Sequence, residues 1–182
     1  MSEPSGVPIP EMFQQSVQVF TKPSVATFEQ FENKGTMRDA LIYVAIGAAI
    51  IGLFGLSDGL LSAIGGVIAT VLGFFVFVYM VHFLGSKQDG NGTIDQVAYT
   101  FALFYIPLQI LTSIIAFVLV ISVIGLLFVP LLPLAALAAS IYFGYLAVQS
   151  SMNMTDSTKI VITLVLSAIV SGFAGFIIRS IL

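Results

Sequence analysis

The longest stretch of this sequence without a charged side chain runs for 60 residues, from Gln96 to Thr155. Only 15 of the 182 residues are Asp, Glu, Lys or Arg, and eight of these lie within the first 39 residues. A soluble domain carries about 25% charged residues, because its surface faces water. An apolar helix of about 20 residues is enough to cross a membrane, so a long stretch without charges is typical of membrane crossings. The sequence therefore predicts a polar N-terminal arm, residues 1–35, followed by a membrane domain, residues 36–182.

Five apolar segments are long enough for a crossing, which requires about 20 residues in a helix. The spacing of charges, glycines and prolines places the crossings at residues 40–57, 67–84, 97–124, 131–148 and 160–178. We expect the pair Gly65-Gly66 to separate a short interfacial segment, Gly59–Ile64, from the second crossing. The residues that mark the hairpin between the third and fourth crossings are Gly125, Pro130 and Pro133. The expected fold class is all-α, a bundle of five transmembrane helices.

An odd number of crossings places the two ends of the chain on opposite sides of the membrane. Cytoplasmic segments of membrane proteins carry an excess of Lys and Arg. With the N-terminus inside, the basic residues on the cytoplasmic side are Lys22, Lys34, Arg38, Lys87 and Lys159, and Arg179 alone lies outside. Tyrosines gather at the same interface, near the inner ends of the crossings: Tyr43, Tyr79, Tyr99, Tyr142 and Tyr145. We therefore expect an N-in, C-out topology.

Two crossings begin with the spacing of a capping box. Thr36 precedes Asp39 by three residues, and Thr93 precedes Gln96 by three residues. In a capping box, the hydroxyl and the second side chain each accept a hydrogen bond from a free backbone N–H group at the helix start. This pattern predicts helix starts at the inner ends of the first and third crossings.

The N-terminal arm contains two short stretches with amphipathic character, residues 10–20 and 24–34. The apolar residues that share a helical face are Met12, Phe13, Val17 and Phe20 in the first stretch, and Phe28 and Phe31 in the second. Such helices pack against the protein's own cytoplasmic loops, bind a partner protein, or lie on the membrane; disorder is a further alternative. The candidate partner-contact residues are Phe13, Phe20, Phe28 and Phe31.

Small residues recur at intervals of four in three crossings. The three stripes are Gly65-Ala69-Gly73, Ala136-Ser140-Gly144 and Ser167-Ser171-Gly175. Small side chains at this spacing let the backbones of two membrane helices approach closely. The stripes therefore predict helix packing, either within one bundle or between copies in a homo-oligomer.

The third crossing carries a small group of polar residues in its apolar sequence. Gln109, Thr112 and Ser113 follow Pro107, which removes one backbone hydrogen bond and frees the carbonyl of Leu103. Polar neighbours can satisfy that carbonyl, which is a purely structural role. The alternative is a ligand or transport site formed by these residues.

Several function classes have no support in the composition. The chain has no cysteine, a single histidine and a net charge of −3 without a basic run, so we expect no thiol chemistry, no metal site, no cofactor and no nucleic-acid partner. The loop from Asp89 to Asp95 partly matches a calcium-binding loop, but Lys87 and Ala98 stand where the first and last carboxylate ligands belong. We expect this loop to be a glycine-rich turn.

Four segments together resemble a known family of membrane proteins. They are Lys22-Pro23 followed by Phe28, Gly92–Tyr99, Tyr105-Ile106-Pro107, and Met154–Ile160. In type and order they are similar to segments of the Yip-domain family, five-span membrane proteins with a cytosolic N-terminus. The segment Asp-Leu-Tyr-Gly-Pro of eukaryotic members is missing, so the resemblance is to the prokaryotic type. It covers residues 20–182 and implies the same five-span layout.

The charge distribution favours an integral membrane scaffold or adaptor, whose arm and inner loops contact membrane or cytoplasmic proteins. A transporter or channel for a small solute or ion, built around Pro107, Gln109, Thr112 and Ser113, is the alternative. An enzyme is disfavoured, because the crossings contain no paired acid, base or metal ligands. We expect a multi-pass protein of the cell membrane, in a prokaryote the cytoplasmic membrane, with the lipid bilayer as its first partner.

Overall fold

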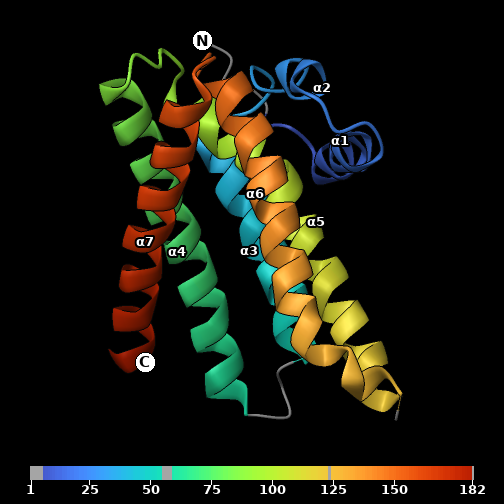
Figure 1. Ribbon diagram of the computed structural model, residues 1–182. Coiled ribbons are helices and arrows are strands. Elements are labelled where there is room, and N and C mark those ends of the chain that lie inside the picture. Colours follow the sequence, from blue (N-terminus) through green and yellow to red (C-terminus); the bar gives the residue numbers. More distant parts are fainter. Residues whose placement is uncertain (1–5, 55–58, 123, 182) are drawn as a thin grey trace.

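The computed structural model describes residues 6–54, 59–122 and 124–181. In these ranges the secondary structure is entirely helical, without strands (Figure 1). The α-helices are α1 Ile9–Thr21, α2 Val25–Glu29, α3 Met37–Phe54, α4 Leu60–Lys87, α5 Ile94–Ile121, α6 Leu132–Ser151 and α7 Ser157–Ile181, and short 3-10 helices span Gly125–Leu127 (η2) and Val129–Leu131 (η3). The all-α fold class is confirmed for this part of the chain.

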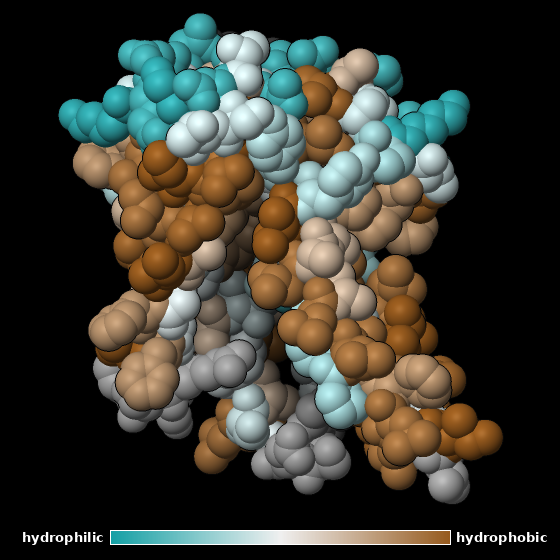
Figure 2. Space-filling model, in the orientation of Figure 1, coloured by the Kyte–Doolittle hydropathy of each residue, from teal (hydrophilic) through white to brown (hydrophobic). Residues whose placement is uncertain are grey.

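Helices α3 to α7 form a bundle, and α1 and α2 lie beside one end of it (Figure 1). Helix α4 packs along α7, α3 packs against α4 and α5, and α6 packs against α5. The α4–α5 and α6–α7 loops lie at the same end as α1 and α2. Hydrophilic residues are concentrated there (Figure 2), and we call this region, residues 6–36, 88–93 and 152–156, the polar end.

The described residues include four helical segments that are long and apolar enough to cross a membrane. They are Leu60–Lys87, Ile94–Ile121, Gly125–Ser151 and Ser157–Ile177. Large apolar side chains project from their sides, and Leu61, Leu137 and Phe173 are all more than half exposed. Such a surface is unfavourable in water but matches the hydrocarbon of a bilayer. The chain is therefore a multi-pass integral membrane protein.

Helix α4 is continuous over 28 residues, so the break that the sequence predicts at Gly65-Gly66 is wrong. Glycine inside a helix costs about 1 kcal/mol relative to alanine. An interrupted helix in lipid leaves backbone groups without partners, which costs several kcal/mol for each group. The turn lies at Gly59 instead, whose φ of 103° is adopted readily only by glycine. The expected interfacial segment is the beginning of α4.

The helix starts agree with the capping patterns. Thr93 Oγ1 accepts a hydrogen bond from the Gln96 N–H at 3.2 Å, and Gln96 Oε1 accepts one from the Thr93 N–H at 2.6 Å. Thr36 and Asp39 make the corresponding pair at 3.3 and 3.0 Å. Both capping boxes are confirmed, and they fix the points where α3 and α5 leave the polar end.

Candidate functional site

One face of α1 packs against the bundle and contains two buried polar side chains. The buried residues of α1 are Met12, Gln15, Ser16 and Val19. The Tyr99 hydroxyl donates a hydrogen bond to Gln15 Oε1 at 2.7 Å, and the hydroxyls of Ser16 and Tyr43 lie 3.0 Å apart. The predicted apolar face is therefore correct in part: Met12 is buried and Phe20 is half-buried, but Phe13 and Val17 are exposed. Gln15 and Ser16 lie in the interior instead, where tyrosine hydroxyls satisfy them.

The segment after α2 is held by a buried carboxylate. The stretch that the sequence predicts as a helix to Lys34 is helical only over α2 and continues as turns. Glu32 is buried and accepts a hydrogen bond from the Ser150 hydroxyl of α6 at 2.5 Å. Nearby, Gln96 Nε2 donates to Asn33 Oδ1 at 2.9 Å. Because a buried charge without partners is costly, these bonds tie the arm to a defined place on the bundle.

The two loops of the polar end bind each other directly. The Asn91 N–H donates to the Met152 carbonyl at 3.1 Å, and Asn153 Nδ2 donates to Asn91 Oδ1 at 2.8 Å. Gly92 lies so close to the backbone of Ser151 that a Cβ at this position would be 1.6 Å from the Ser151 carbonyl oxygen. The glycine-rich turn therefore allows a backbone contact that no side chain permits.

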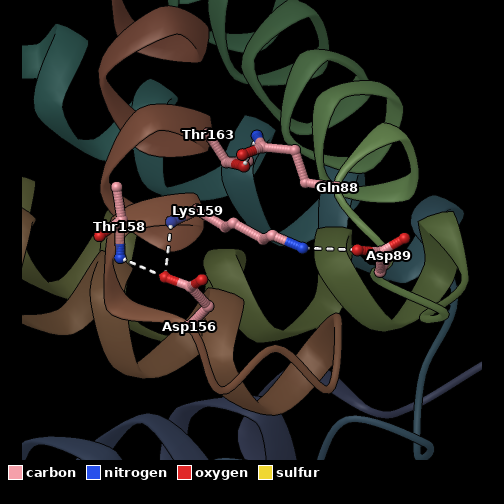
Figure 3. Close-up of polar contacts among 6 residues, drawn as sticks. All are labelled: Gln88, Asp89, Asp156, Thr158, Lys159 and Thr163. Atoms are coloured by element: carbon pink, nitrogen blue, oxygen red, sulfur yellow. Dashed lines mark hydrogen bonds and ion pairs between the residues drawn. The ribbon is translucent and has the colours of Figure 1, made fainter.

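An ion pair joins the α4–α5 loop to the first turn of α7 at the surface (Figure 3). Lys159 Nζ lies 2.5 Å from Asp89 Oδ2, and the hydrogen bond and positive charge of Lys159 lower the pKa of Asp89 below its ordinary value. Asp156 Oδ1 accepts hydrogen bonds from the backbone N–H groups of Thr158 and Lys159 at 2.8 and 3.3 Å, which caps α7. These contacts fix the start of α7 relative to the end of α4.

The four candidate partner-contact residues lie in different environments. Phe28 and Phe31 are buried against the protein itself, and Phe20 is half-buried with its ring centroid 4.7 Å from that of Phe143. Phe13 is 59% exposed. Of these four, Phe13 offers most of its side chain to the surroundings.

The polar group near Pro107 does not share one environment. Helix α5 continues through Pro107, and Thr112 donates its hydroxyl to the Leu108 carbonyl at 2.8 Å. Gln109 is exposed and lines a cavity of about 550 Å³, whereas Thr112 and Ser113 are not among the residues lining that cavity. The structure therefore brings only Gln109 of the three polar side chains to this cavity.

Some residues of the small-residue stripes line two cavities, and others lie at contacts between helices. The members that line a cavity are Ala69, Gly73, Ser140, Gly144, Ser171 and Gly175, Ser167 is buried, and Gly65 and Ala136 are half-buried. A Cβ on Gly144 would meet Leu164 at 3.3 Å, whereas one on Gly73 or Gly175 would meet no atom within 4 Å. Helices α6 and α7 thus approach near Gly144, and the other two glycines face open space.

Sequence reasoning did not single out Gln15, Ser16 or Glu32 as contact residues. The sequence does contain a pattern that places Gln15 and Ser16 on one helical face with Met12 and Val19. Because two of these four residues are polar, the face does not look apolar and was not predicted to be buried. No set of three or more His, Asp or Glu side chains is placed to hold a metal ion within the described ranges. The contacts that hold the polar end together are the hydrogen bonds of the arm and the loops described above.

A bundle of apolar helices with one polar end defines a multi-pass membrane protein of all-α type. The family model of the Yip1 domain matches residues 17–178. The chain therefore belongs to the Yip1 domain family, as the sequence resemblance predicts. The match includes the last five residues of α1, all of α2 to α6 and most of α7. No curated protein and no solved structure matches the chain.

Proposed function

We propose that this protein is a non-enzymatic membrane scaffold that presents the polar end as a preformed platform to other proteins. The observation that carries the proposal is the docking of the arm, in which Gln15, Ser16 and Glu32 are buried and hydrogen-bonded to the bundle. A flexible tether has no need of such contacts, whereas a rigid platform does, because preorganisation lowers the entropy cost of binding.

We further propose five crossings, with α3 as the first, and a cytoplasmic polar end. Helix α3 has 18 residues, is apolar from Ala40 onward and packs beside α4 and α5. Five of the six basic residues then lie on the cytoplasmic side. In a prokaryotic cell this topology belongs to the cytoplasmic membrane.

Single cysteines test the topology cleanly, because the chain has none of its own. We expect Glu29→Cys and Thr155→Cys to be labelled from the cytoplasmic side of membrane vesicles, and Leu127→Cys from the opposite side. All three positions are exposed. Labelling of Thr155→Cys by an impermeant reagent in intact cells would contradict the orientation.

A hollow on the platform is the best candidate for a partner contact. It has a volume of about 480 Å³ between α1 and the turn after α2, and its lining includes Glu11, Gln14, Gln18, Phe31 and Lys34. Charged and amide groups around an aromatic ring fit a polar protein segment better than lipid.

The adaptor role is tested by cross-linking and co-purification from native membranes. We expect the double variant Gln14→Arg/Gln18→Arg to lose partners that the wild type retains, because both side chains line the hollow. The matched control is Gln30→Arg, which changes an exposed glutamine outside the hollow. An identical set of partners for the wild type and the double variant would contradict the proposal.

Transport of a small solute or ion is the second candidate, and one observation favours it. Gln109 lines the 550 Å³ cavity together with Thr70 and Tyr105, which places polar atoms near the middle of the bundle. We expect a transporter to show solute flux in liposomes that Gln109→Leu abolishes. Flux that is equal in both proteins would exclude a role for Gln109.

A further inference from the structure

The bundle contains one cleft that neither the platform nor its partners use. The cavities of about 310 and 550 Å³ share the lining residues Gly73, Tyr105 and Gly172, so they adjoin each other. Residues of α4 and α7 line this combined space together with residues of α5 and α6, and Ile51 of α3 lines the larger cavity. We call this space the membrane cleft; Figure 2 shows the surface hollowed between α7 and α6.

The membrane cleft lies at the depth of the hydrocarbon. Gly73 is 13 residues from the start of α4 and 14 from its end, which is about 20 Å in each direction along the helix. Ile141 and Ile169, on the two helices beside the hollow, are 57% and 59% exposed on the sides of the bundle. The cleft is therefore continuous with the apolar surface that faces lipid.

Part of the lining of the cleft is aromatic. Phe77 and Phe101 have ring centroids 5.2 Å apart, Phe101 and Phe104 5.3 Å, and Phe74 and Tyr105 5.5 Å. Glycines on α4 and α7 also line the cleft, and a Cβ on Gly73, Gly172 or Gly175 would meet no atom within 4 Å. Aromatic rings together with glycines leave a slot with room for an apolar chain.

The depth and the lining of the cleft favour one kind of occupant. The 310 Å³ part of the cleft is lined mainly by apolar side chains and does not hold water well, because water needs several polar partners. Hydrocarbon tails are present at this depth, and filling the slot gives its walls contact atoms that they otherwise lack.

We propose that the membrane cleft is a binding site for one acyl chain of a bilayer phospholipid, which enters sideways between α6 and α7. The chain packs against the glycines of α4 and α7 and against the rings of Phe74, Phe101 and Phe104. Van der Waals packing stabilises the bound chain, as it stabilises helix contacts in lipid. The site does not depend on any partner of the platform.

A phosphatidylcholine with a photoreactive diazirine near the end of one acyl chain tests this site. After reconstitution of the full-length protein and illumination, mass spectrometry locates the labelled residues. We expect the label to concentrate on the α5 segment 101–105 and the α7 segment 168–172, which line the cleft. Even labelling of all lipid-facing helices would overturn the proposal, because it indicates only the surrounding lipid layer.

Leucine substitutions provide matched variants. Gly172→Leu and Gly73→Leu fill the slot from different helices, whereas Gly66→Leu places the same side chain on α4 in open space outside the cleft. We expect labelling of the cleft segments to fall about tenfold, or ~1.4 kcal/mol, in the first two and to stay unchanged in the third. An equal fall in Gly66→Leu, unchanged labelling in both cleft variants, or cross-links from a second copy into the cleft would overturn it. If the two cleft variants misfold, the labelling pattern of the wild type decides alone.

Discussion

The hydrogen bond between Tyr99 and Gln15 is the most direct test of how the arm is held. In Tyr99→Phe the ring remains and only the hydroxyl is lost. Gln15 is 3% exposed. In the variant, its Oε1 atom loses the Tyr99 hydroxyl, which donates a hydrogen bond to it at 2.7 Å in the wild type. A buried acceptor without a partner costs about 1–3 kcal/mol.

This free-energy cost destabilises the state in which α1 packs against the bundle. It does not affect a detached α1, because water then binds the Gln15 side chain. Amide hydrogen exchange of α1 measures the free energy of local opening. A loss of about 1–3 kcal/mol raises the exchange rates of α1 roughly 5- to 150-fold. We expect this acceleration in Tyr99→Phe, with little change in α7. The control is Tyr79→Phe, which removes a hydroxyl from an exposed tyrosine of α4.

The double variant Gln15→Met/Tyr99→Phe separates the hydrogen bond from general damage. Removing both polar partners while keeping their shapes is nearly neutral, whereas removing one leaves a buried group unsatisfied. We therefore expect α1 of the double variant to exchange more slowly than α1 of Tyr99→Phe. Additive effects of the two substitutions, or no acceleration in Tyr99→Phe, would refute the view that this bond holds the arm.

Three further predictions concern the loops of the polar end. Gly92→Ala places a methyl group against the backbone at the end of α6, so we expect a lower thermal unfolding temperature in detergent, whereas Gly66→Ala, in open space, does not lower it. Thr93→Ala removes the capping hydroxyl of α5 and is expected to destabilise the protein by about 1 kcal/mol in the same assay; no change would show that the cap is dispensable. Because Lys159 lowers the pKa of Asp89 from 3.8, the pair stabilises the loops above that pH and its contribution disappears as the pH falls through the lowered pKa. Exchange of loop amides should therefore depend less on acid in Asp89→Asn than in the wild type, and equal pH profiles would contradict a role for the pair.

The docked arm also changes how truncations are interpreted. Met12, Val19 and Phe28 belong to the same hydrophobic core as residues of α5 and α6. Deleting residues 1–35 therefore exposes part of that core, and a lost partner would not distinguish a missing contact from a disturbed bundle. Substitutions in the hollow of the platform avoid this problem, because the exposed side chains of α1 do not contribute to the core.

Local patterns explain what the sequence predicted well. The long charge-free segments predict apolar helices, because backbone groups in lipid find partners only within the helix or in a closed barrel. The boxes at Thr36 and Thr93 predict helix starts, because both partners of each box lie within four residues. The turn at Gly125 and Pro130 follows from the same local chemistry.

The failures have a different physical origin. At Gly65-Gly66 the local preference for a turn is overridden by the cost of free backbone groups in lipid. In α1 the burial of Gln15 and Ser16 depends on tyrosine hydroxyls that are 84 and 27 residues distant in sequence. Neither outcome can be calculated from a window of neighbouring residues.

The sequence by itself determined the all-α membrane class, the Yip1 family and the gathering of charge near the arm and two loops, since these depend on composition and short-range order. Only the tertiary structure decided which face of α1 is buried, that the two loops bind each other, and that a cleft lies between α6 and α7. Those features arise where segments distant in sequence meet, and their free energies depend on the distances between atoms of different helices.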